Sequence, residues 1–304
     1  MKGSERVRDS DCADEDKPEN PRAGIAEVVR LHHAGIGNIR WTQCGHPPYR
    51  GDWSSSIRAG AEMIVRRQTA LFLDYDGTLV DLAATPEAAH PPQGLVPLLQ
   101  RLAVDLDGAV AILSGRTVAD IDRMLAPLEA TVGGVHGAEI RMADGALECL
   151  ETPEELAGIR TLCKALGSEA PALRIEDKGQ AIAVHFRAVP EAEERVGQAL
   201  RAALAASRDL ELIHGKMVYE VRRPGMHKGA VLQRLMQRMP FRDRTPLMIG
   251  DDRTDEDAFA MALQLGGSAI KVGEGDTVAP SRLANPDAVR HLLARAVETM
   301  KDDQ

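Results

Sequence analysis

At Leu71-Phe72-Leu73-Asp74-Tyr75-Asp76-Gly77-Thr78-Leu79 an apolar run ends abruptly in two carboxylates one residue apart. The run predicts a buried parallel strand with Asp74 at its carboxyl end, the edge where open α/β sheets bind ligands. Because residues i and i+2 of a strand point to one side, we expect Asp74 and Asp76 to face one small site. Two acids there suit a magnesium ion with a nucleophile and a proton-transfer group. The structural alternative is a capping aspartate followed by an Asp-Gly turn.

Predicted strands and helices alternate along most of the chain, which indicates an α/β protein with a doubly wound, mostly parallel, Rossmann-like sheet. The expected strands are 71–73, 109–113, 131–135, 246–249 and 268–272. The expected helices are 57–68, 93–106, 118–128, 228–239, 255–265 and 288–300. Thr117 is the expected N-cap of the helix over 118–128, because its hydroxyl can accept a hydrogen bond from a free backbone amide.

The middle of the chain has a different rhythm. Helices predicted over 153–166 and 190–206 alternate with paired strand-like runs, at 173–177 with 181–187 and at 210–214 with 217–222. This pattern predicts an inserted α/β cap domain, an antiparallel sheet plus two helices, lying as a lid over the strand ends. The predicted organisation is an N-terminal extension, partly disordered, over 1–66, a core over 67–145 and 224–304, and a cap over 146–223.

Composition and charge exclude several classes of protein. A formal charge of −9 disfavours nonspecific binding to nucleic acid or to an anionic membrane. The four cysteines are scattered and suggest neither a disulfide framework nor a zinc site. Neither a signal peptide nor a membrane span is predicted, so we expect a cytoplasmic protein. His32, His33 and His46 of the extension are expected to be solvated rather than metal ligands.

Three further motifs end or follow predicted core strands. Ser114-Gly115-Arg116 places a hydroxyl before a helix N-terminus, where a phosphate can bind. Lys228 opens a helix, and a solvated surface lysine is the alternative there. Gly250-Asp251-Asp252 again ends an apolar strand in acids, so Asp251 is equivalent in position to Asp74. Glu256 and Asp257 need serve only the helix dipole.

Together, the four motifs resemble those of haloacid-dehalogenase-like (HAD) phosphatases over about residues 69–300. The resemblance implies that Asp74 forms an aspartyl-phosphate, and that Asp76 protonates the leaving oxygen and then activates water. It implies Mg²⁺ on Asp74, Asp76 (through its backbone carbonyl) and Asp251, with Asp252 or Asp255 acting through water or on neighbouring ligands. It also implies that Ser114 and Lys228 bind the phosphoryl oxygens and that Tyr75 contacts the substrate. Arg116 either holds the phosphate or only caps its loop. Such a set suits phosphoryl transfer, which depends on positioning and on charge neutralisation.

Segments outside the four motifs resemble trehalose-6-phosphate phosphatases. They are 134–139, 176–179 with 184–187, and 215–222; the segment 250–259, which contains the fourth motif, resembles that family nearly throughout. The resemblance implies hydrolysis of the phosphosugar trehalose 6-phosphate to trehalose and phosphate, the last step of trehalose synthesis. It implies that Lys178 and Glu220 hold the sugar hydroxyls, which suits charge-assisted hydrogen bonds. Four other residues are expected in either substrate-binding or structural roles: His136, Glu139, His185 and Arg187.

Several alternatives remain open at this stage. Another sugar-phosphate phosphatase or a sugar phosphomutase would share the core and differ in its cap contacts. A non-catalytic phosphosugar sensor would bind without turnover, although intact Asp74, Asp76, Lys228 and Asp251 argue against it. A receiver-type phosphoacceptor domain shares the strand-end acids but lacks the inserted cap. Functional coupling to a trehalose-6-phosphate synthase is also left open.

Overall fold

The computed structural model describes residues 65–83, 89–215 and 217–302. The predicted extension over 1–66 lies almost wholly outside these residues, and so does most of the helix predicted over 57–68. The described end of that helix, residues 65–68, forms a bend and a turn instead. In the described part of the chain, no helix combines the length and apolarity needed to cross a membrane.

The larger sheet has eight strands in the order β12-β11-β10-β1-β2-β3-β4-β5. Its strands are β1 (Thr69–Leu73), β2 (Val110–Leu113), β3 (Thr131–Gly134), β4 (Glu139–Arg141), β5 (Leu147–Cys149), β10 (Thr245–Gly250), β11 (Ser268–Val272) and β12 (Ser281–Leu283). The pairings from β12 through β3 are parallel, and β4 and β5 add an antiparallel edge. The predicted mostly parallel sheet is therefore confirmed. The sequence reading missed β4, β5 and β12, which are three residues each.

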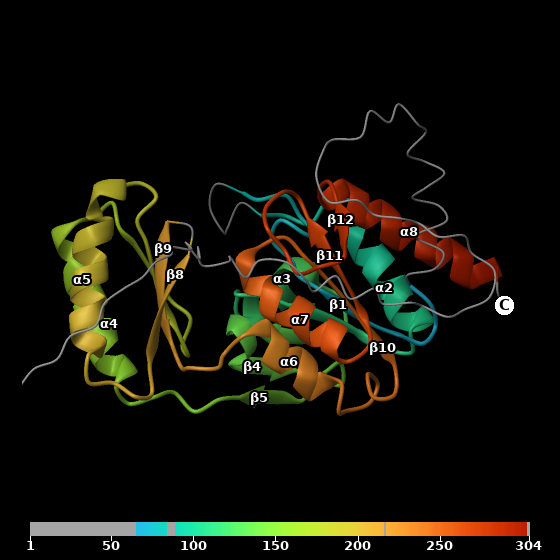
Figure 1. Cartoon of the computed structure of the whole chain (residues 1–304), viewed down its shortest axis with the longest axis horizontal. Helices are drawn as coiled ribbons and strands as arrows, with labels where there is room; N and C mark the ends of the chain where they lie inside the picture. The colour runs from blue at the N-terminus through green and yellow to red at the C-terminus, as the bar shows by residue number, and fades with distance from the viewer. Residues whose placement is uncertain (1–64, 84–88, 216, 303–304) are drawn as a thin grey trace, which may run out of the picture. The chain divides into compact units, whose positions relative to one another are not determined.

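Helices cover the central strands on both faces, which explains why every residue of β1 and β2 is buried. The helices are α2 (Leu95–Asp105), α3 (Val118–Leu125), α6 (Lys228–Leu235), α7 (Glu256–Gln264) and α8 (Pro286–Asp302). Figure 1 shows α2 and α8 together on one side of this sheet, with α6 and α7 on the other. The predicted N-cap of α3 is confirmed, because Oγ1 of Thr117 accepts a hydrogen bond from the backbone of Asp120.

The smaller sheet is antiparallel, in the order β6-β7-β9-β8. Its strands are β6 (Arg174–Asp177), β7 (Ile182–His185), β8 (Glu211–Gly215) and β9 (Val218–Arg222), accompanied by helices α4 (Leu156–Glu169) and α5 (Glu193–Leu204) (Figure 1). The predicted helix over 190–206 starts as a 3₁₀ turn, Pro190–Ala192, before α5. A separate cluster of buried side chains, including Cys163, Phe186 and Val196, joins α4 and α5 to this sheet. The expected antiparallel sheet plus two helices is thus confirmed.

Strand register brings the site residues to one edge of the larger sheet. Leu73 of β1 pairs with Ile249 of β10 and with Ile112 of β2. Because these strands are parallel, the residues that follow them emerge at the same carboxyl edge. Asp74 comes one residue after this register point, whereas Ser114 and Asp251 come two residues after it. The fold therefore gathers side chains that are far apart in sequence.

Candidate active site

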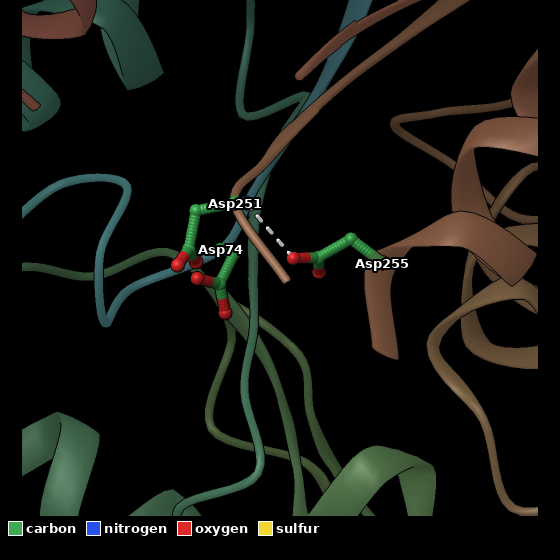
Figure 2. A group of neighbouring side chains, drawn as sticks. All are labelled: Asp74, Asp251 and Asp255. Carbon is green, nitrogen blue, oxygen red and sulfur yellow. Dashed lines mark hydrogen bonds between the residues drawn. The ribbon is translucent and has the colours of Figure 1, made fainter. Parts of the chain in front are cut away.

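Three carboxylates meet at the carboxyl edge of β1 and β10 (Figure 2). Asp74, Asp251 and Asp255 each offer an oxygen, and these oxygens lie within 4.8 Å of one another. Asp255 ends the 3₁₀ turn η4 (Arg253–Asp255) at the start of α7, and its side chain is fully buried. Its Oδ2 accepts hydrogen bonds from the backbone amides of Asp251 (3.0 Å) and Asp252 (2.9 Å). Asp255 therefore holds the loop that carries Asp251.

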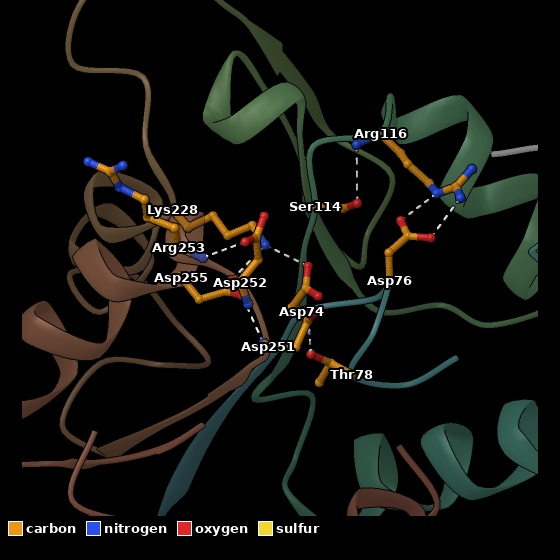
Figure 3. A network of polar contacts seen from close by, with 10 residues as sticks. All are labelled: Asp74, Asp76, Thr78, Ser114, Arg116, Lys228, Asp251, Asp252, Arg253 and Asp255. Carbon is orange, nitrogen blue, oxygen red and sulfur yellow. Dashed lines mark hydrogen bonds and ion pairs between the residues drawn. The ribbon is translucent and has the colours of Figure 1, made fainter. Parts of the chain in front are cut away.

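Lys228 links two of these carboxylates at the N-terminus of α6 (Figure 3). Its Nζ lies 2.5 Å from Oδ1 of Asp74 and 2.7 Å from Oδ1 of Asp255. The helix begins after His227, whose Nδ1 accepts a hydrogen bond from the backbone of Ala230. Only 3% of the Lys228 side chain is exposed. The alternative of a solvated surface lysine is therefore wrong.

One lysine does not neutralise this cluster. Burial raises the pKa of Asp74 well above its ordinary value; Lys228 opposes the rise, while Asp255 and Asp251 reinforce it. Burial and the neighbouring Asp255 raise the pKa of Asp251 to about 6. Burial would lower the pKa of Lys228, but Asp255 and Asp74 outweigh that effect and raise it. An additional cation would relieve the repulsion among these acids.

The donor set fits a hard divalent cation such as Mg²⁺, which prefers carboxylate oxygens. The backbone at Gly77 has φ 79°, and a Cβ at this position would collide with the carboxylate of Asp251. Oγ1 of Thr78 lies 3.4 Å from Oδ1 of Asp251 and orients that carboxylate. Asp74 and Asp251 are the residues with oxygens left for a cation. Both oxygens of Asp255 are already engaged by Lys228 and by backbone amides.

Asp252 does not join the cluster. Its side chain accepts a hydrogen bond from the backbone of Arg253 at 2.7 Å and caps the η4 turn. The residue is exposed, so any effect on a cation would pass through water or through its neighbours. Asp252 and Asp255 together form a capping box, in which each side chain bonds the other's backbone amide.

Asp76 faces Arg116 rather than the three carboxylates (Figure 3). Nε of Arg116 lies 2.6 Å from Oδ2 of Asp76, and Nη2 lies 2.7 Å from Oδ1. The physical reason is that β1 ends at Leu73, so the i, i+2 rule that predicted a shared site with Asp74 no longer applies at Asp76. The chain is already turning there.

Ser114 and Tyr75 complete this side of the site. Ser114 is buried at the end of β2, and its Oγ accepts a hydrogen bond from the backbone of Arg116 at 3.1 Å. The guanidinium of Arg116 lies 5.7 Å from the ring centroid of Tyr75. Burial and the nearby Asp76 raise the pKa of Tyr75 to about 12, so its phenol is neutral at physiological pH. The hydroxyl of Ser114, through its bond to the backbone of Arg116, lies near the N-terminus of α3, a place that suits a phosphate.

The smaller sheet contributes a buried ion pair. Nζ of Lys178, which follows β6, lies 2.9 Å from Oε2 of Glu220 on β9, and about a tenth of each side chain is exposed. Burial would raise the pKa of Glu220, but Lys178 and other neighbouring cations lower it to about 2. His136 lies between β3 and β4 of the larger sheet, and its Nε2 is 3.5 Å from the other oxygen of Glu220. Glu220 is therefore a carboxylate at neutral pH.

Glu139, His185 and Arg187 are expected in either substrate-binding or structural roles, and their contacts differ. A carboxylate oxygen of Glu139 accepts a hydrogen bond from the backbone of Val118, which tethers the start of α3. Nε2 of His185 lies 2.9 Å from Glu176 across the β6–β7 hairpin. Both contacts are made to other groups of the protein. Arg187 is exposed.

Sequence reasoning missed Lys271 and gave Thr78 no role. Lys271 is buried in β11, and its Nζ donates to the backbone carbonyls of Asp251 and Val272. It therefore supports the loop that carries Asp251. A lone lysine inside the apolar run 269–272 was the available signal, because an unpaired buried lysine is rare.

Comparison with known proteins settles the family. Residues 72–286 match the family model described as trehalose-phosphatase, which is more than half of the chain. The chain belongs to the trehalose-phosphatase family. The trehalose-6-phosphate phosphatase of Escherichia coli (strain K12) is 36% identical over 220 residues, covering 72% of this chain and 83% of that protein. The predicted family resemblance is confirmed.

Solved structures place this trehalose-phosphatase family member in the HAD fold. A crystal structure described as a trehalose-6-phosphate phosphatase related protein superposes with a TM-score of 0.64 at 29% identity, covering 77% of this chain and 99% of that one. A haloacid-dehalogenase-like hydrolase from B. subtilis shares the fold at 16% identity, with a TM-score of 0.53 over 74% of this chain and 99% of that one. The predicted fold class is confirmed.

Proposed function

We propose that this protein hydrolyses trehalose 6-phosphate to trehalose and inorganic phosphate, the last step of trehalose synthesis. The observation that carries the proposal is the position of Lys228, whose ammonium bridges Asp74 and Asp255 at the mouth of the strand-end site. A buried carboxylate beside a lysine, a serine hydroxyl and a cation-ready acid matches the needs of phosphoryl transfer. Membership of the trehalose-phosphatase family supports the choice of substrate.

In the first step, a carboxylate oxygen of Asp74 attacks phosphorus. The bond between phosphorus and the sugar oxygen breaks, and that oxygen takes a proton from Asp76 in its acid form. Because Asp76 is held by Arg116, it must loosen this contact to reach the leaving oxygen. Trehalose then leaves, and the phosphoryl group stays on Asp74.

In the second step, water attacks the aspartyl-phosphate and gives its proton to Asp76. The bond between phosphorus and the Asp74 oxygen breaks, which releases inorganic phosphate and restores both carboxyl groups. Lys228 and Ser114 bind the phosphoryl oxygens throughout, so the charge that develops is met by fixed groups. Asp255 acts by positioning Lys228 and the backbone of the Asp251 loop.

Magnesium is part of the proposal. Asp74 and Asp251 would hold it through side-chain oxygens and Asp76 through its backbone carbonyl, with Asp252 acting through water. When bound, the cation supplies positive charge between the carboxylate nucleophile and the anionic ester. The crowding of Asp74 and Asp251 beside Asp255 supports this assignment.

The sugar is assigned to the inserted domain. The sequence predicts the bounds 146–223 for it, but β5 (Leu147–Cys149) pairs with β4 in the larger sheet, so we propose the bounds 150–223. Lys178 and Glu220 are charged, almost fully buried and paired, so each can exchange part of its pairing for a sugar hydroxyl. A disaccharide offers hydroxyls on both rings, which a pocket of fixed charges can distinguish from a single hexose. A glycosyl-transfer reaction is one source of this phosphate ester, and functional coupling to a trehalose-6-phosphate synthase belongs to the same proposal.

A substrate panel tests this function. Phosphate release is measured with trehalose 6-phosphate, glucose 6-phosphate and mannose 6-phosphate, each after removal of divalent ions and again after addition of Mg²⁺. We expect turnover only with Mg²⁺, and a kcat/KM for trehalose 6-phosphate at least about tenfold above that for either hexose phosphate. A preference for a hexose phosphate overturns the substrate assignment. Equal turnover without divalent ions overturns the metal assignment.

A further inference from the structure

His136 lies on a strained connection next to the phosphate loop. Val135 and His136 have φ values of 45° and 52°, in the left-handed region that β-branched residues rarely adopt. Two hydrogen bonds hold this conformation: the amide of Val135 donates to the carbonyl of Arg116 at 2.8 Å, and that of His136 donates to the carbonyl of Ser114 at 3.0 Å. Backbone strain of this kind persists where the surroundings fix it, and it clusters at functional sites.

The imidazole of His136 lies against Gly115. A Cβ built on Gly115 would lie 2.7 Å from Nε2 and 2.8 Å from Cε1 of that ring, too close for any real contact. The absence of a side chain at position 115 therefore makes room for the ring. The ring therefore lies close to the Ser114–Gly115 backbone.

On its other side, the ring faces Glu220. Nε2 lies 3.5 Å from Oε1 of Glu220, and Nη1 of Arg222 lies 4.0 Å from the same oxygen. Within the described part of the chain this buried oxygen accepts no hydrogen bond. The second oxygen, Oε2, is taken by Lys178 at 2.9 Å. A small movement would convert the Nε2–Oε1 approach into a hydrogen bond to a carboxylate, one of the stronger kinds.

The ring is neutral, and its surroundings favour one tautomer. Burial lowers the pKa of His136 to about 3; Glu220 opposes the shift, and three neighbouring cations support it: Lys178, Lys228 and Arg222. A neutral imidazole carries a single N–H. Nδ1 is buried and has no partner among the described residues, whereas Nε2 faces a carboxylate oxygen. A proton on Nε2 is therefore the favoured arrangement.

His136 also shares a cavity with the chain segments that join the two sheets. It lines a cavity of about 140 Å³ together with Leu150 and Met226. Leu150 follows β5 at the entry to the inserted segment, and Met226 lies between β9 and α6 at its exit. The residue thus lies beside the phosphate loop, the sugar-site carboxylate and a cavity that both connections line.

We propose that His136 is a positioning residue for sugar recognition, whose Nε2–H donates to Oε1 of Glu220 and holds that carboxylate in register with the phosphate loop at Ser114. The proposal rests on the proposed function, since it assigns Glu220 to the sugar. It gives the buried Oε1 of Glu220 a hydrogen-bond donor beside the more distant Arg222, and it accounts for the glycine at position 115 and the strained backbone at 135–136.

The first test compares two substitutions. His136→Asn keeps a residue that tolerates the left-handed backbone but is too short to reach Glu220, whereas His136→Gln restores a longer amide donor. The readout is the ratio of kcat/KM for trehalose 6-phosphate to kcat/KM for p-nitrophenyl phosphate, which has no sugar. We expect this ratio to fall about tenfold in the Asn variant, the value of a hydrogen bond to a charged group, and to recover in the Gln variant. An unchanged ratio overturns the proposal.

A second variant reaches the same contact from Gly115. Gly115→Ala places a methyl group where the ring lies, so the ratio should fall as it does in His136→Asn. In the double variant Gly115→Ala/His136→Asn the ratio should be no lower than in His136→Asn alone, because the damage passes through the ring. Independent, multiplied losses would overturn the coupling. The exposed His291 on α8 gives a matched control, since His291→Asn should leave the ratio unchanged.

A measurement without turnover separates this inference from the proposed function. In the wild-type protein labelled with ¹⁵N at histidine, the nitrogen shifts of His136 should show a proton on Nε2 and none on Nδ1 at pH 7. Glu220→Gln should move the Nε2 shift. A proton on Nδ1, or an Nε2 shift unaffected by Glu220→Gln, overturns the proposed contact. If wild type fails to hydrolyse trehalose 6-phosphate, the proposed function fails while this contact is still decided.

Discussion

Arg116 grips Asp76 with two nearly parallel hydrogen bonds, Nε to Oδ2 at 2.6 Å and Nη2 to Oδ1 at 2.7 Å. The pair is partly sheltered, since 13% of the Arg116 side chain and 31% of the Asp76 side chain are exposed. Such a fork fixes the plane of the carboxylate as well as its position. In the proposed reaction, Arg116 thereby fixes the position of the proton donor, Asp76, before Asp76 moves to the leaving oxygen.

Substitution of Arg116 should therefore lower turnover. Arg116→Lys keeps the charge but cannot hold both oxygens of Asp76, so we expect kcat for trehalose 6-phosphate to fall about tenfold. Arg116→Ala should cost about 100-fold, within the usual contribution of a positioned acid–base group. Steady-state phosphate release with Mg²⁺ measures both. A Lys variant as active as wild type would show that the two-point contact is unimportant.

Asp74→Asn should abolish catalysis without harming the fold. The amide cannot act as the nucleophile, so we expect phosphate release to fall by at least about 1,000-fold. Burial already raises the pKa of Asp74, which means that the charged form is unfavourable there, and Lys228 keeps its contact with Asp255. The thermal midpoint measured in EDTA should consequently stay equal or rise by about 2–4 °C. Substantial activity in this variant would remove Asp74 from its proposed role.

The gathering of Asp74, Ser114 and Asp251 could be predicted because parallel strands deliver their carboxyl ends to one edge, whereas Lys228 reaches the site from the start of α6. The orientation of Asp76 could not, since strand periodicity stops at Leu73 and a turn follows. Sequence position shows which edge a residue reaches. It does not show where a side chain points once the strand has ended.

The contribution of the backbone around the site was also hidden from the sequence. Asp255 is predicted to act through water or on neighbouring metal ligands; the structure adds a direct contact of its carboxylate, at the end of η4, with Lys228. The strands β4 and β5 have half-exposed, mixed sequences, so no alternation of apolar residues marked them. These features depend on how α7 and the edge hairpin pack, which is a tertiary effect.

Lys228→Met should destabilise the protein when no divalent ion is present. The substitution leaves the carboxylates of Asp74 and Asp255 buried without their cation, and breaking a buried pair in this way costs about 3–5 kcal/mol. Urea unfolding in EDTA measures the loss. Lys164→Met on α4 is the matched control, because Lys164 is exposed and its loss should change the free energy of unfolding by less than about 0.5 kcal/mol.

Added Mg²⁺ should return part of the stability lost in Lys228→Met, because the cation supplies charge beside the same acids. Activity should stay low, since the phosphoryl oxygens have lost a fixed partner. Equal free energies of unfolding for Lys228→Met and Lys164→Met in EDTA would contradict the view that Lys228 offsets the carboxylate cluster.

Acidification should destabilise the fold through His136 before it does so through Glu220. The ordinary histidine pKa is 6.5, and burial lowers the pKa of His136 to about 3. Between these values the unfolded chain binds a proton that the folded protein does not, so stability is lost as the pH falls below 6.5. The pKa of Glu220 is lowered from 4.5 to about 2, and its contribution is lost only below pH 4.5. At pH 5, therefore, His136 has begun to destabilise the fold and Glu220 has not.

The size and specificity of this effect can be measured by difference. From pH 6.5 to pH 5 the loss through His136 amounts to about 1.6 kcal/mol, because the slope rises from half of 1.36 kcal/mol per pH unit at pH 6.5 to nearly the full value at pH 5. His136→Asn should lack this loss, whereas His291→Asn, with an exposed histidine replaced, should retain it. Asp251, whose raised pKa of about 6 acts in the opposite direction on acidification, contributes equally to all three proteins and cancels. Urea unfolding at both pH values gives the comparison, and identical pH dependence in wild type and His136→Asn would show that His136 is not buried as a neutral ring.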